Sequence, residues 1–527
     1  MAAVAAAASP QPRRLRVGLF ADARLQPRWI VEAFDKVARS DFADIVLISA
    51  GDSPPGGRKA SLVWKLYGKL DRWAFGADPS ERVDLASLRA LGCAPDPRRH
   101  ELDVAFALGE VDDVALDGVA AHGVWRFCFG AERDHAEGLA GWREVAGGTP
   151  VSGSGIKVKL AKGTPPRLAY QSWSRTYPLS VARNRAQLLR KTAEFAFRAL
   201  RELHRSGRAW LEQCKIIREC EGARALPANT ELLSALPAIG GRIAERAVQK
   251  ALSVDQWFLA WRFGERRFGE NIPADLQGYT RAMPPRNREW ADPFAIAKNG
   301  RYFVFFEEMP FAAGKGHISM IEVKRDGGWS APVRVLERDY HLSYPFLIEE
   351  GGELYMIPES AQDQSVQVFR CVDFPLRWKL EKTLLQGVRL VDATFHRRAD
   401  RWWMFANAAA SGSRIFDDEL HLFHSQTLLG TWLPHRRNPV KSDARCARPA
   451  GDFFTLGGRL YRPAQICVPL YGAGLSINRV QRLTPDEYAE RQVERILPAG
   501  GLLGLHTVNR AGDLTVIDAF TRRGRFT

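Results

Sequence analysis

The N-terminal part of the chain alternates short apolar runs with longer stretches in which apolar residues recur every three or four positions. This alternation is typical of an α/β domain, in which buried strands are connected by helices that cover the sheet. We predict helices over residues 29–40 and 180–204. The predicted strands are Leu15–Ala21, Asp44–Ser49, Leu102–Gly109, Gly123–Phe129 and Gly155–Leu160.

The helical pattern loosens after this region, where Leu226-Pro-Ala-Asn and Leu236-Pro-Ala-Ile-Gly-Gly interrupt short helical pieces. We therefore predict an α/β domain over residues 15–210 and a helical connector over residues 211–254. An Ala-rich flexible tail is expected at residues 1–14.

From residue 255 onward the pattern changes to short aromatic strands separated by Gly or Asp turns, and the chain repeats itself. Five segments align, and their starts are separated by 52, 48, 58 and 54 residues. About 50 residues for each four-stranded unit is the spacing of a β-propeller. We predict a five-bladed β-propeller over residues 255–527, its last blade closed by a strand from before Asp292.

The repeat predicts which distant residues meet, because equivalent positions in a propeller lie at the same level of the central channel. The predicted inner-strand ring is Asp292, Tyr344, Asp392, Ala450 and Gly504. The predicted second-strand ring is Glu307, Glu359, Asn407, Gln465 and Ala519. The third-strand ring includes His317, Gln367, His421 and Ser476.

Four acidic residues fall in these rings, namely Asp292, Glu307, Glu359 and Asp392. A carboxylate that faces a channel is costly to desolvate unless it does chemistry, binds a cation or hydrogen-bonds a polyol. Strand-start Asp residues also cap turns, which is the structural alternative for Asp292 and Asp392.

Composition and charge restrict the partners. The chain is 46% hydrophobic and 26% charged, as expected of a globular multidomain protein, and its net charge of +15 favours anionic partners. Seven scattered cysteines without a Cys-x-x-Cys pair indicate reduced thiols and a cytoplasmic location. The longest apolar runs are too short for a transmembrane helix, so any membrane contact is expected to be peripheral.

The N-terminal domain resembles the Rossmann-like N-terminal fold of formyltransferases, through its opening strand, the strand before Gly109 and the Gly123-Val-Trp segment. That family uses an Asn, a His and an Asp in formyl transfer. The matching stretch Trp125–Gly130 has neither Asn nor His, and Ala161–Pro166 stands where the Asp is expected. The resemblance therefore implies a scaffold or docking domain. The alternative is that His122, Asp134 and His135 replace the family's catalytic residues.

The propeller resembles two groups of carbohydrate-active proteins. Its Asp292-Pro-Phe opening and its carboxylates resemble arabinanase/fructosidase-type propellers, in which two Asp and one Glu cleave or transfer glycosyl units. A second resemblance is to the propeller region of the glucosamine inositolphosphorylceramide transferase family. Its motifs are Tyr344-Pro-Phe, Met356-Ile-Pro-Glu-Ser, Val391-Asp-Ala-Thr, Arg448-Pro-Ala-Gly and Tyr461-Arg-Pro-Ala-Gln. Plant members carry a separate glycosyltransferase domain beyond this region, so their transferase activity is not carried over directly.

These resemblances imply catalytic roles for three carboxyl groups. Asp292 is the expected base or nucleophile, Glu359 the expected acid, and Asp392 the group that orients the sugar or tunes its neighbour. The remaining predicted substrate-binding residues are Glu307, His317, His341, Tyr344, Asn407, His421, Arg448, Arg462 and Gln465. Arg448 and Arg462 are equally suited to salt bridges between blades.

Three functions stay open at this point. The first is glycosyl transfer or hydrolysis on a glycan, nucleotide-sugar or glycolipid during synthesis of a cell-surface glycan. The others are a non-catalytic glycan-binding scaffold and a sugar N-formyltransferase-like enzyme. No cofactor or nucleic-acid partner is expected, and Ca²⁺ in the channel is left open. The basic helix at 180–204 and the residues after it either contact anionic lipid or form a solvated basic face.

Overall fold

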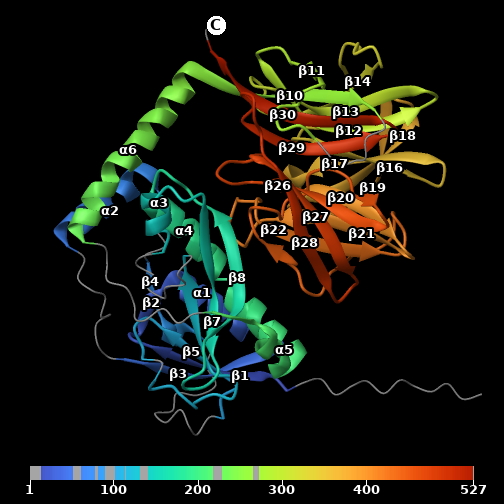
Figure 1. Ribbon diagram of the computed structural model, residues 1–527. Coiled ribbons are helices and arrows are strands. Elements are labelled where there is room, and N and C mark those ends of the chain that lie inside the picture. Colours follow the sequence, from blue (N-terminus) through green and yellow to red (C-terminus); the bar gives the residue numbers. More distant parts are fainter. Residues whose placement is uncertain are drawn as a thin grey trace, which may run out of the picture. The chain divides into compact units, whose positions relative to one another are not determined.

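The computed structural model describes residues 13–51, 61–76, 81–88, 101–112, 114–130, 140–217, 228–264 and 272–525. The chain divides into two compact units, Met1–Ser172 with Thr176–Arg242 and Trp173–Arg175 with Ile243–Thr527. Figure 1 shows most of the first unit in blue to green and most of the second in yellow to red. Residues 1–12 of the expected tail lie outside the described residues, as do Asp134 and His135.

The first unit is a mixed α/β structure around one seven-stranded sheet of order β3-β1-β5-β6-β7-β8-β9. Strands β3, β1, β5 and β6 pair in parallel, and β7 pairs antiparallel to β6. The strands of this sheet are β1 (Leu15–Ala21), β3 (Ala43–Ala50), β5 (Val104–Leu108), β6 (Val124–Phe129), β7 (Val151–Lys159), β8 (Arg167–Arg175) and β9 (Lys215–Ile216). Strands β2 (Leu25–Pro27) and β4 (Arg82–Asp84) form a separate pair.

Helices α1, α4 and α5 of the first unit bury apolar side chains in its core. The expected helix at 29–40 is observed as α1 (Arg28–Ala38), with Trp29, Phe34 and Val37 buried. The expected long helix at 180–204 is observed as two helices, because Ala193 and Glu194 form a turn between them. The other helices of this unit are α2 (Leu62–Phe75), η1 (Leu85–Ser87), α3 (Trp142–Ala146), α4 (Val181–Thr192) and α5 (Phe195–Gln213). Helix α6 (Asn229–Leu252) begins in the first unit and ends in the second, since the division falls between Arg242 and Ile243.

The second unit is a five-bladed β-propeller, as the repeat predicts. Each of the first four blades follows the chain from its inner strand outward, and each begins with an antiparallel hairpin. Their strands are β12 (Arg288–Lys298), β13 (Arg301–Pro310), β14 (His317–Val323), β15 (Val333–Leu336), β16 (Ser343–Glu350), β17 (Glu353–Ser360), β18 (Ser365–Asp373), β19 (Arg377–Gln386), β20 (Leu390–Arg398), β21 (Arg401–Ala408), β22 (Glu419–Ser425), β23 (Leu433–Pro434), β24 (Lys441–Ser442), β25 (Phe454–Leu456), β26 (Arg459–Ile466), β27 (Gly474–Leu483) and β28 (Tyr488–Ile496).

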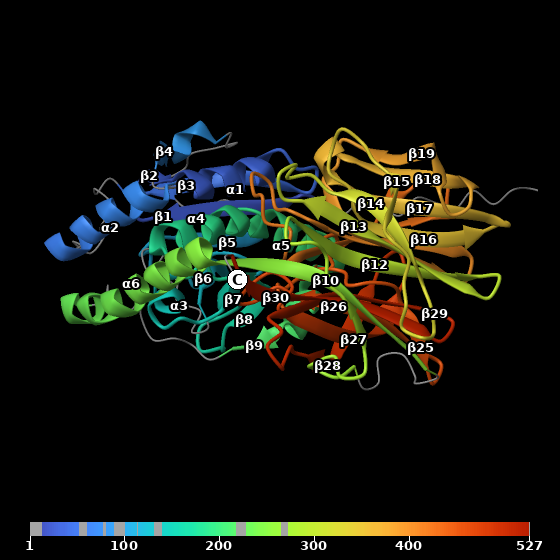
Figure 2. The same ribbon diagram turned by 90° about the horizontal axis from the view of Figure 1, so that it is seen from above.

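The fifth blade joins the two ends of the propeller sequence. Its strands are β10 (Ser253–Phe263), β11 (Thr280–Ala282), β29 (Gly504–Ala511) and β30 (Leu514–Gly524), in the order β11-β10-β30-β29. Strand β10 pairs along its whole length with β30, from Ser253 opposite Gly524 to Phe263 opposite Leu514. In both views green β10 lies beside red β30 (Figures 1 and 2). This pairing confirms the predicted closure by a strand that precedes Asp292.

A bulge recurs in four of the five inner strands. The pairing register shifts between Ala291 and Phe294 in β12, and at the equivalent positions of β16, β20 and β29. A bulge re-aims the side chains of a strand and is common near functional sites. The bulge therefore decides which side chain of each inner strand is turned toward the centre.

The bulge also corrects the predicted inner ring. In the fifth blade the register shifts between Leu505 and Val508, so His506, rather than Gly504, is equivalent to Asp292. Leu505 pairs with Ala519, whereas Ala291 pairs with Glu307, so the fifth hairpin is two residues shorter between these positions. An alignment anchored on the second strand is therefore displaced by two residues on the inner strand.

Candidate functional site

The first residue of the bulge has the same uncommon backbone conformation in three successive blades. Asp292, Tyr344 and Asp392 have φ of 54°, 46° and 52°. A residue other than Gly in this region costs about 1–3 kcal/mol and persists where the surrounding structure enforces it. Three residues predicted to share one ring thus share one enforced geometry.

Asp392 is contacted by two side chains, Arg448 and Gln465. Its Oδ2 accepts hydrogen bonds from Arg448 Nε at 2.6 Å and Gln465 Nε2 at 2.8 Å, and its Oδ1 accepts from Arg448 Nη2 at 3.3 Å. The Asp392 side chain is 2% exposed and that of Arg448 is 12% exposed. A two-pronged arginine contact both neutralises and orients a carboxylate. The structure thus brings together three of the predicted site residues.

Glu359 lies close enough to Asp392 for the two carboxyl groups to interact. Burial raises the pKa of Glu359, the negative charge of Asp392 raises it further, and Arg448 opposes both, so that the pKa is about 8. The Glu359 carboxyl therefore carries a proton at neutral pH. A protonated carboxyl beside an ion-paired carboxylate is the arrangement that general acid catalysis requires.

Asp292 is held from three directions. Thr507 Oγ1 donates to its Oδ1 at 2.6 Å, His506 Nε2 lies 3.3 Å from the same oxygen, and its backbone N–H donates to Asp518 Oδ2 at 2.8 Å. Burial raises the pKa of Asp292 and His506 lowers it, with a net value of about 6. The carboxylate is thus the prevailing form at neutral pH.

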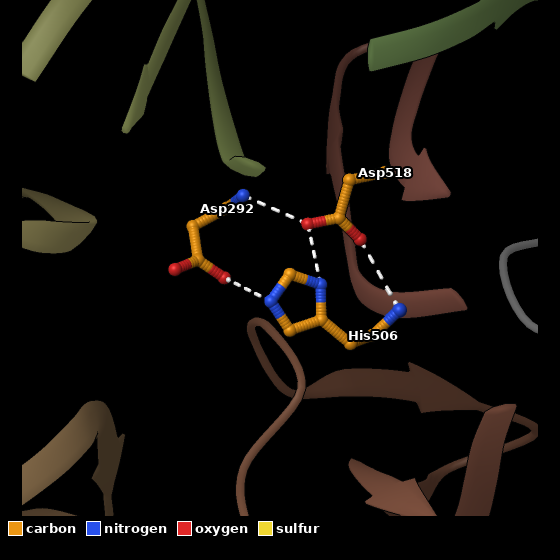
Figure 3. Close-up of side chains that lie close together, drawn as sticks. All are labelled: Asp292, His506 and Asp518. Carbon is orange, nitrogen blue, oxygen red and sulfur yellow. Dashed lines mark hydrogen bonds and ion pairs between the residues drawn. The ribbon is translucent and has the colours of Figure 1, made fainter. Parts of the chain in front are cut away.

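His506, in the fifth blade, lies between the carboxylates of Asp292 and Asp518, as Figure 3 shows. Its Nδ1 lies 2.6 Å from Asp518 Oδ2, and Asp518 Oδ1 accepts from the backbone N–H of Thr507 at 2.8 Å. The ring of Trp257 lies against the imidazole, with centroids 4.0 Å apart. Burial lowers the pKa of His506, but Asp518 and Asp292 outweigh it and raise the pKa to about 9. The imidazole is therefore charged at neutral pH.

Asp292, His506 and Asp518 also present one candidate ligand atom each within 4.8 Å of one another. Calcium prefers six to eight oxygen ligands, whereas this group offers one imidazole nitrogen and two carboxylates. Both oxygens of Asp518 already accept backbone N–H groups, those of Asp292, His506 and Thr507. The donor set therefore does not fit calcium, and the group is an ion-paired network.

Two further carboxyl groups extend the acidic centre. Burial first, and then the charges of Asp292 and Glu289, raise the pKa of Glu307 well above its usual range. His341 Nε2 lies 3.3 Å from Glu307 Oε1, and its Nδ1 accepts from the backbone N–H of Gly316 at 2.9 Å. Burial lowers the pKa of His341, so the ring is neutral. Glu289 was not predicted, and burial raises its pKa to about 7.

Tyr344 and Asn407 hold neighbouring segments in place. The Tyr344 hydroxyl accepts from the backbone N–H of Gly451 at 2.7 Å and hydrogen-bonds Thr394 Oγ1 at 2.7 Å. Asn407 Nδ2 donates to the Phe416 carbonyl at 2.9 Å. Both side chains are buried, and each is hydrogen-bonded to a neighbouring segment of the propeller.

The structure places three predicted substrate-binding residues in other surroundings. His317 lies 3.3 Å from Glu308, and successive strand residues face opposite sides, so His317 is on the face away from Glu307. Arg462 is sealed in the fourth blade, where it pairs with Glu490 at 2.7 Å. His421 lines a cavity of about 590 Å³ in the third blade, together with Arg389, Arg414 and Phe416.

Sequence reasoning missed His506, Asp518, Thr507 and Tyr471. The Tyr471 ring lies 4.7 Å from the Arg448 guanidinium carbon, and it also contacts the ring of His506. The motif His506-Thr507 followed by Asp518 was visible in the sequence. Counting back from the hairpin turn would have aligned Leu505 with Asp292, because each arm of the fifth hairpin is one residue shorter, so only the observed register places His506 there.

The fold and the site together define a five-bladed β-propeller with a buried, coupled set of carboxyl groups at its centre. Residues 280–499 match the family model described as glucosamine inositolphosphorylceramide transferase 1, N-terminal. This match confirms the resemblance predicted for the propeller from its motifs. The resemblance of the first unit to formyltransferases stays a prediction.

Curated relatives agree with this match. The protein named glucosamine inositolphosphorylceramide transferase 1 from Oryza sativa subsp. japonica is 34% identical over 203 residues, which are 38% of this chain and 27% of the relative. Its Arabidopsis thaliana counterpart is 32% identical over 212 residues, 40% of this chain and 28% of the relative. The chain thus matches little more than a quarter of each relative's length.

Two solved glycosidases are structurally similar at low sequence identity. A family GH43 β-1,3-galactosidase has a TM-score of 0.32 at 12% identity and covers 42% of this chain and 84% of its own. An exo-1,5-α-L-arabinanase from a bovine ruminal metagenomic library has a TM-score of 0.32 at 14% identity, covering 45% and 93%.

Proposed function

We propose that the propeller binds a sugar at its centre and transfers or hydrolyses a glycosyl unit there. The observation that carries the proposal is the contrast between two neighbouring carboxyl groups. Glu359, whose pKa is raised to about 8, holds a proton, while Asp392 beside it is paired with Arg448 and Gln465. Pairs of titratable groups whose environments separate their protonation states mark acid and base assignments.

Each carboxyl group has a role in this proposal. Glu359 donates its proton to the leaving oxygen of the glycosidic or ester bond as that bond breaks. Asp292, which the charged His506 favours as a carboxylate, acts as the base or nucleophile. Asp392, fixed by two arginine nitrogens, orients a sugar hydroxyl and supports the proton on Glu359.

The substrate class follows from the matched family and from charge. The relatives are named as transferases that act on an inositolphosphorylceramide, so we propose a glycan or glycolipid substrate with a nucleotide-sugar as one donor class. The net charge of +15 supports an anionic substrate. A glycan-binding scaffold is the alternative, because Arg448 already neutralises Asp392 without a ligand.

For the first unit we propose a Rossmann-like, formyltransferase-related scaffold in the cytoplasm. Four parallel strands in the order β3-β1-β5-β6, with α1 beside β3, support this assignment. The stretch Val124–Phe129, where a formyltransferase would carry catalytic residues, is a fully buried strand with neither Asn nor His. This burial supports a docking role over catalysis.

The test is mass-spectrometric detection of products after incubation with oligosaccharides, nucleotide-sugars and lipid-linked sugars. We expect the wild type to convert one class and Glu359→Gln to lose about 100-fold to 10,000-fold of that activity, because the amide cannot act as an acid. The matched control is Glu353→Gln, an exposed residue on the same strand. If the wild type and both variants bind sugar and none produces a new mass, the scaffold alternative replaces the enzyme.

A further inference from the structure

Helix α2 of the first unit carries an exposed apolar stripe. Leu62 is 83% exposed, Leu66 59%, Leu70 57% and Trp73 86%. Their spacing of four, four and three residues puts them on one face, because a helix turns by about 100° per residue. Four large apolar side chains in a continuous row on the surface indicate an interaction site.

The orientation of α2 is set by its opposite face. Trp64, Val63 and Tyr67 pack into a cluster with Leu232 and Ile239 of α6. Trp64 also lies edge-to-face on Trp142, with centroids 4.6 Å apart. These contacts use the inward face of the helix, so the apolar stripe is left outward in the structure.

Polar contacts reinforce this orientation. Ser61 Oγ accepts from the backbone N–H of Trp64 at 3.2 Å and caps the helix. The buried Asp71 Oδ2 accepts from the backbone N–H of Ala182 at 2.7 Å, at the start of α4. The one acidic side chain of α2 is thereby turned away from the exposed face.

The charges that remain near the stripe are positive. Lys65 and Lys69 are exposed along one edge of it, and Arg72 follows one turn later. An amphipathic helix with Leu and Trp on one face and Lys or Arg along its edge is the pattern that lies in the interface of an anionic bilayer. Long basic side chains then extend to the lipid headgroups while the apolar residues enter the acyl boundary.

We propose that α2 docks the protein on the surface of an anionic lipid bilayer, with Leu62, Leu66, Leu70 and Trp73 inserted and Lys65 and Lys69 at the headgroups. A bilayer suits the stripe because apolar and cationic groups lie side by side along a single straight helix. This surface belongs to the first unit and does not depend on the proposed propeller chemistry.

The proposal moves the membrane contact away from the basic segment that the sequence suggested. In α4 and α5 the apolar residues Leu188, Leu200 and Leu203 are buried. Several cations there contact the protein itself, since Arg183 lies over Tyr177 and Arg198 donates to the Tyr170 hydroxyl at 2.9 Å. That face offers charge without exposed apolar area.

The test is sedimentation of the full chain with vesicles of phosphatidylcholine alone and of phosphatidylcholine mixed with phosphatidylserine. We expect binding to the mixed vesicles that weakens with added salt. Leu66→Glu with Trp73→Glu should lower the partition constant at least about 100-fold, because two inserted side chains are lost. Lys65→Gln with Lys69→Gln should lower it about 30-fold, because two cationic contacts are lost.

The matched control is Leu433→Glu with Leu497→Glu, two propeller residues that are each 53% exposed. We expect this variant to bind as the wild type does, and all variants to keep the wild-type circular dichroism. Absence of wild-type binding to mixed vesicles, or an equal loss in the control, overturns the proposal. So does size-exclusion chromatography that shows a dimer dissociated by Leu66→Glu with Trp73→Glu, without vesicle binding, because the stripe then serves self-association.

Discussion

Two buried arginine–carboxylate pairs of the propeller have the same chemistry and different surroundings. Arg462 and Glu490 are 0% and 2% exposed, and Lys441 and Tyr488 contact the same carboxylate. Arg448 and Asp392 are 12% and 2% exposed, and Asp392 also interacts with Glu359. All charged groups of the first pair are buried and paired with one another. In the second pair the Arg448 side chain is partly exposed, and the protonated Glu359 lies beside Asp392.

This difference teaches that burial of an ion pair does not by itself indicate function. Arg462 donates to the carbonyls of Cys446 and Ala447 as well as to Glu490, so it joins a loop to the fourth blade. Arg448 and Gln465 instead converge on one carboxylate from another blade. What distinguishes the candidate site from the Arg462–Glu490 pair is that neighbouring carboxyl groups from different blades, Glu359 and Asp392, differ in protonation state. Four predictions test this difference.

Removal of Arg462 from the buried Arg462–Glu490 pair is expected to have the largest effect. Arg462→Ala removes the guanidinium from Glu490, which retains Lys441 and Tyr488, and from two backbone carbonyls. Loss of one partner of a buried ion pair costs about 3–5 kcal/mol of the free energy of unfolding. Urea denaturation measures this loss. Arg459→Ala, an exposed arginine on the same strand, should stay within about 0.5 kcal/mol of the wild type. A loss below about 1 kcal/mol in Arg462→Ala would contradict a structural role.

Asp392→Asn is expected to lower activity more than stability. The amide carries no negative charge to neutralise Arg448 or to raise the pKa of Glu359, so turnover should fall by about 100-fold or more. The free energy of unfolding should fall by less than in Arg462→Ala, because Arg448 is partly exposed and can be solvated. The product assay and urea denaturation of the same sample measure both. If Asp392→Asn instead lowers the free energy of unfolding as much as Arg462→Ala does, the Asp392–Arg448 pair is structural, like the Arg462–Glu490 pair.

The two centres should respond to pH in opposite directions. Burial opposes ionisation of Glu490, but Arg462 and Lys441 outweigh it and lower its pKa to about 2. Its contribution of about 2–3 kcal/mol is therefore present above the ordinary Glu pKa of about 4.3 and is lost as pH falls toward 2. The pKa of Glu359 is raised to about 8, so the folded state retains its proton and stability declines as pH rises from about 4.3 to 8.

Thermal unfolding across this pH range, for the wild type, Glu490→Gln and Glu359→Gln, separates the two contributions. Glu490→Gln should flatten the acid side of the stability profile and Glu359→Gln the alkaline side. Activity should also decline above about pH 8 as Glu359 loses its proton. If Glu490→Gln loses stability at low pH in the same way as the wild type, the acid dependence does not come from Glu490.

The smallest expected effect concerns the brace at the centre. Tyr344→Phe removes a hydroxyl that accepts from the Gly451 N–H and contacts Thr394, and should cost about 1–2 kcal/mol of the free energy of unfolding. Tyr355→Phe, on the neighbouring strand of the same blade, is the control. If Tyr344→Phe loses activity 100-fold with unchanged stability, the hydroxyl acts on the substrate instead.

Local patterns were sufficient for the elements and for much of the site. The alternating aromatic strands around Asp292, Tyr344 and Asp392 predicted the blades, because each blade is a local meander that repeats. The rings of that alignment included Asp392, Glu359 and Gln465, and the family motif supplied Arg448. The structure brings these residues together. The break between α4 and α5 was missed, because apolar periodicity continues across Ala193 and Glu194.

The sequence by itself thus determined the repeat, the closing strand of the last blade and most of the residues that converge on Asp392. Only the tertiary structure decided that His506 and Asp518 join Asp292, that Arg462 is sealed with Glu490, and that the stripe on α2 faces outward. The physical reason is that a strand's side chains alternate faces, so one bulge or one shortened hairpin changes which residue points inward. Burial and pairing of charges depend on elements distant in the chain, and local periodicity carries no information about them.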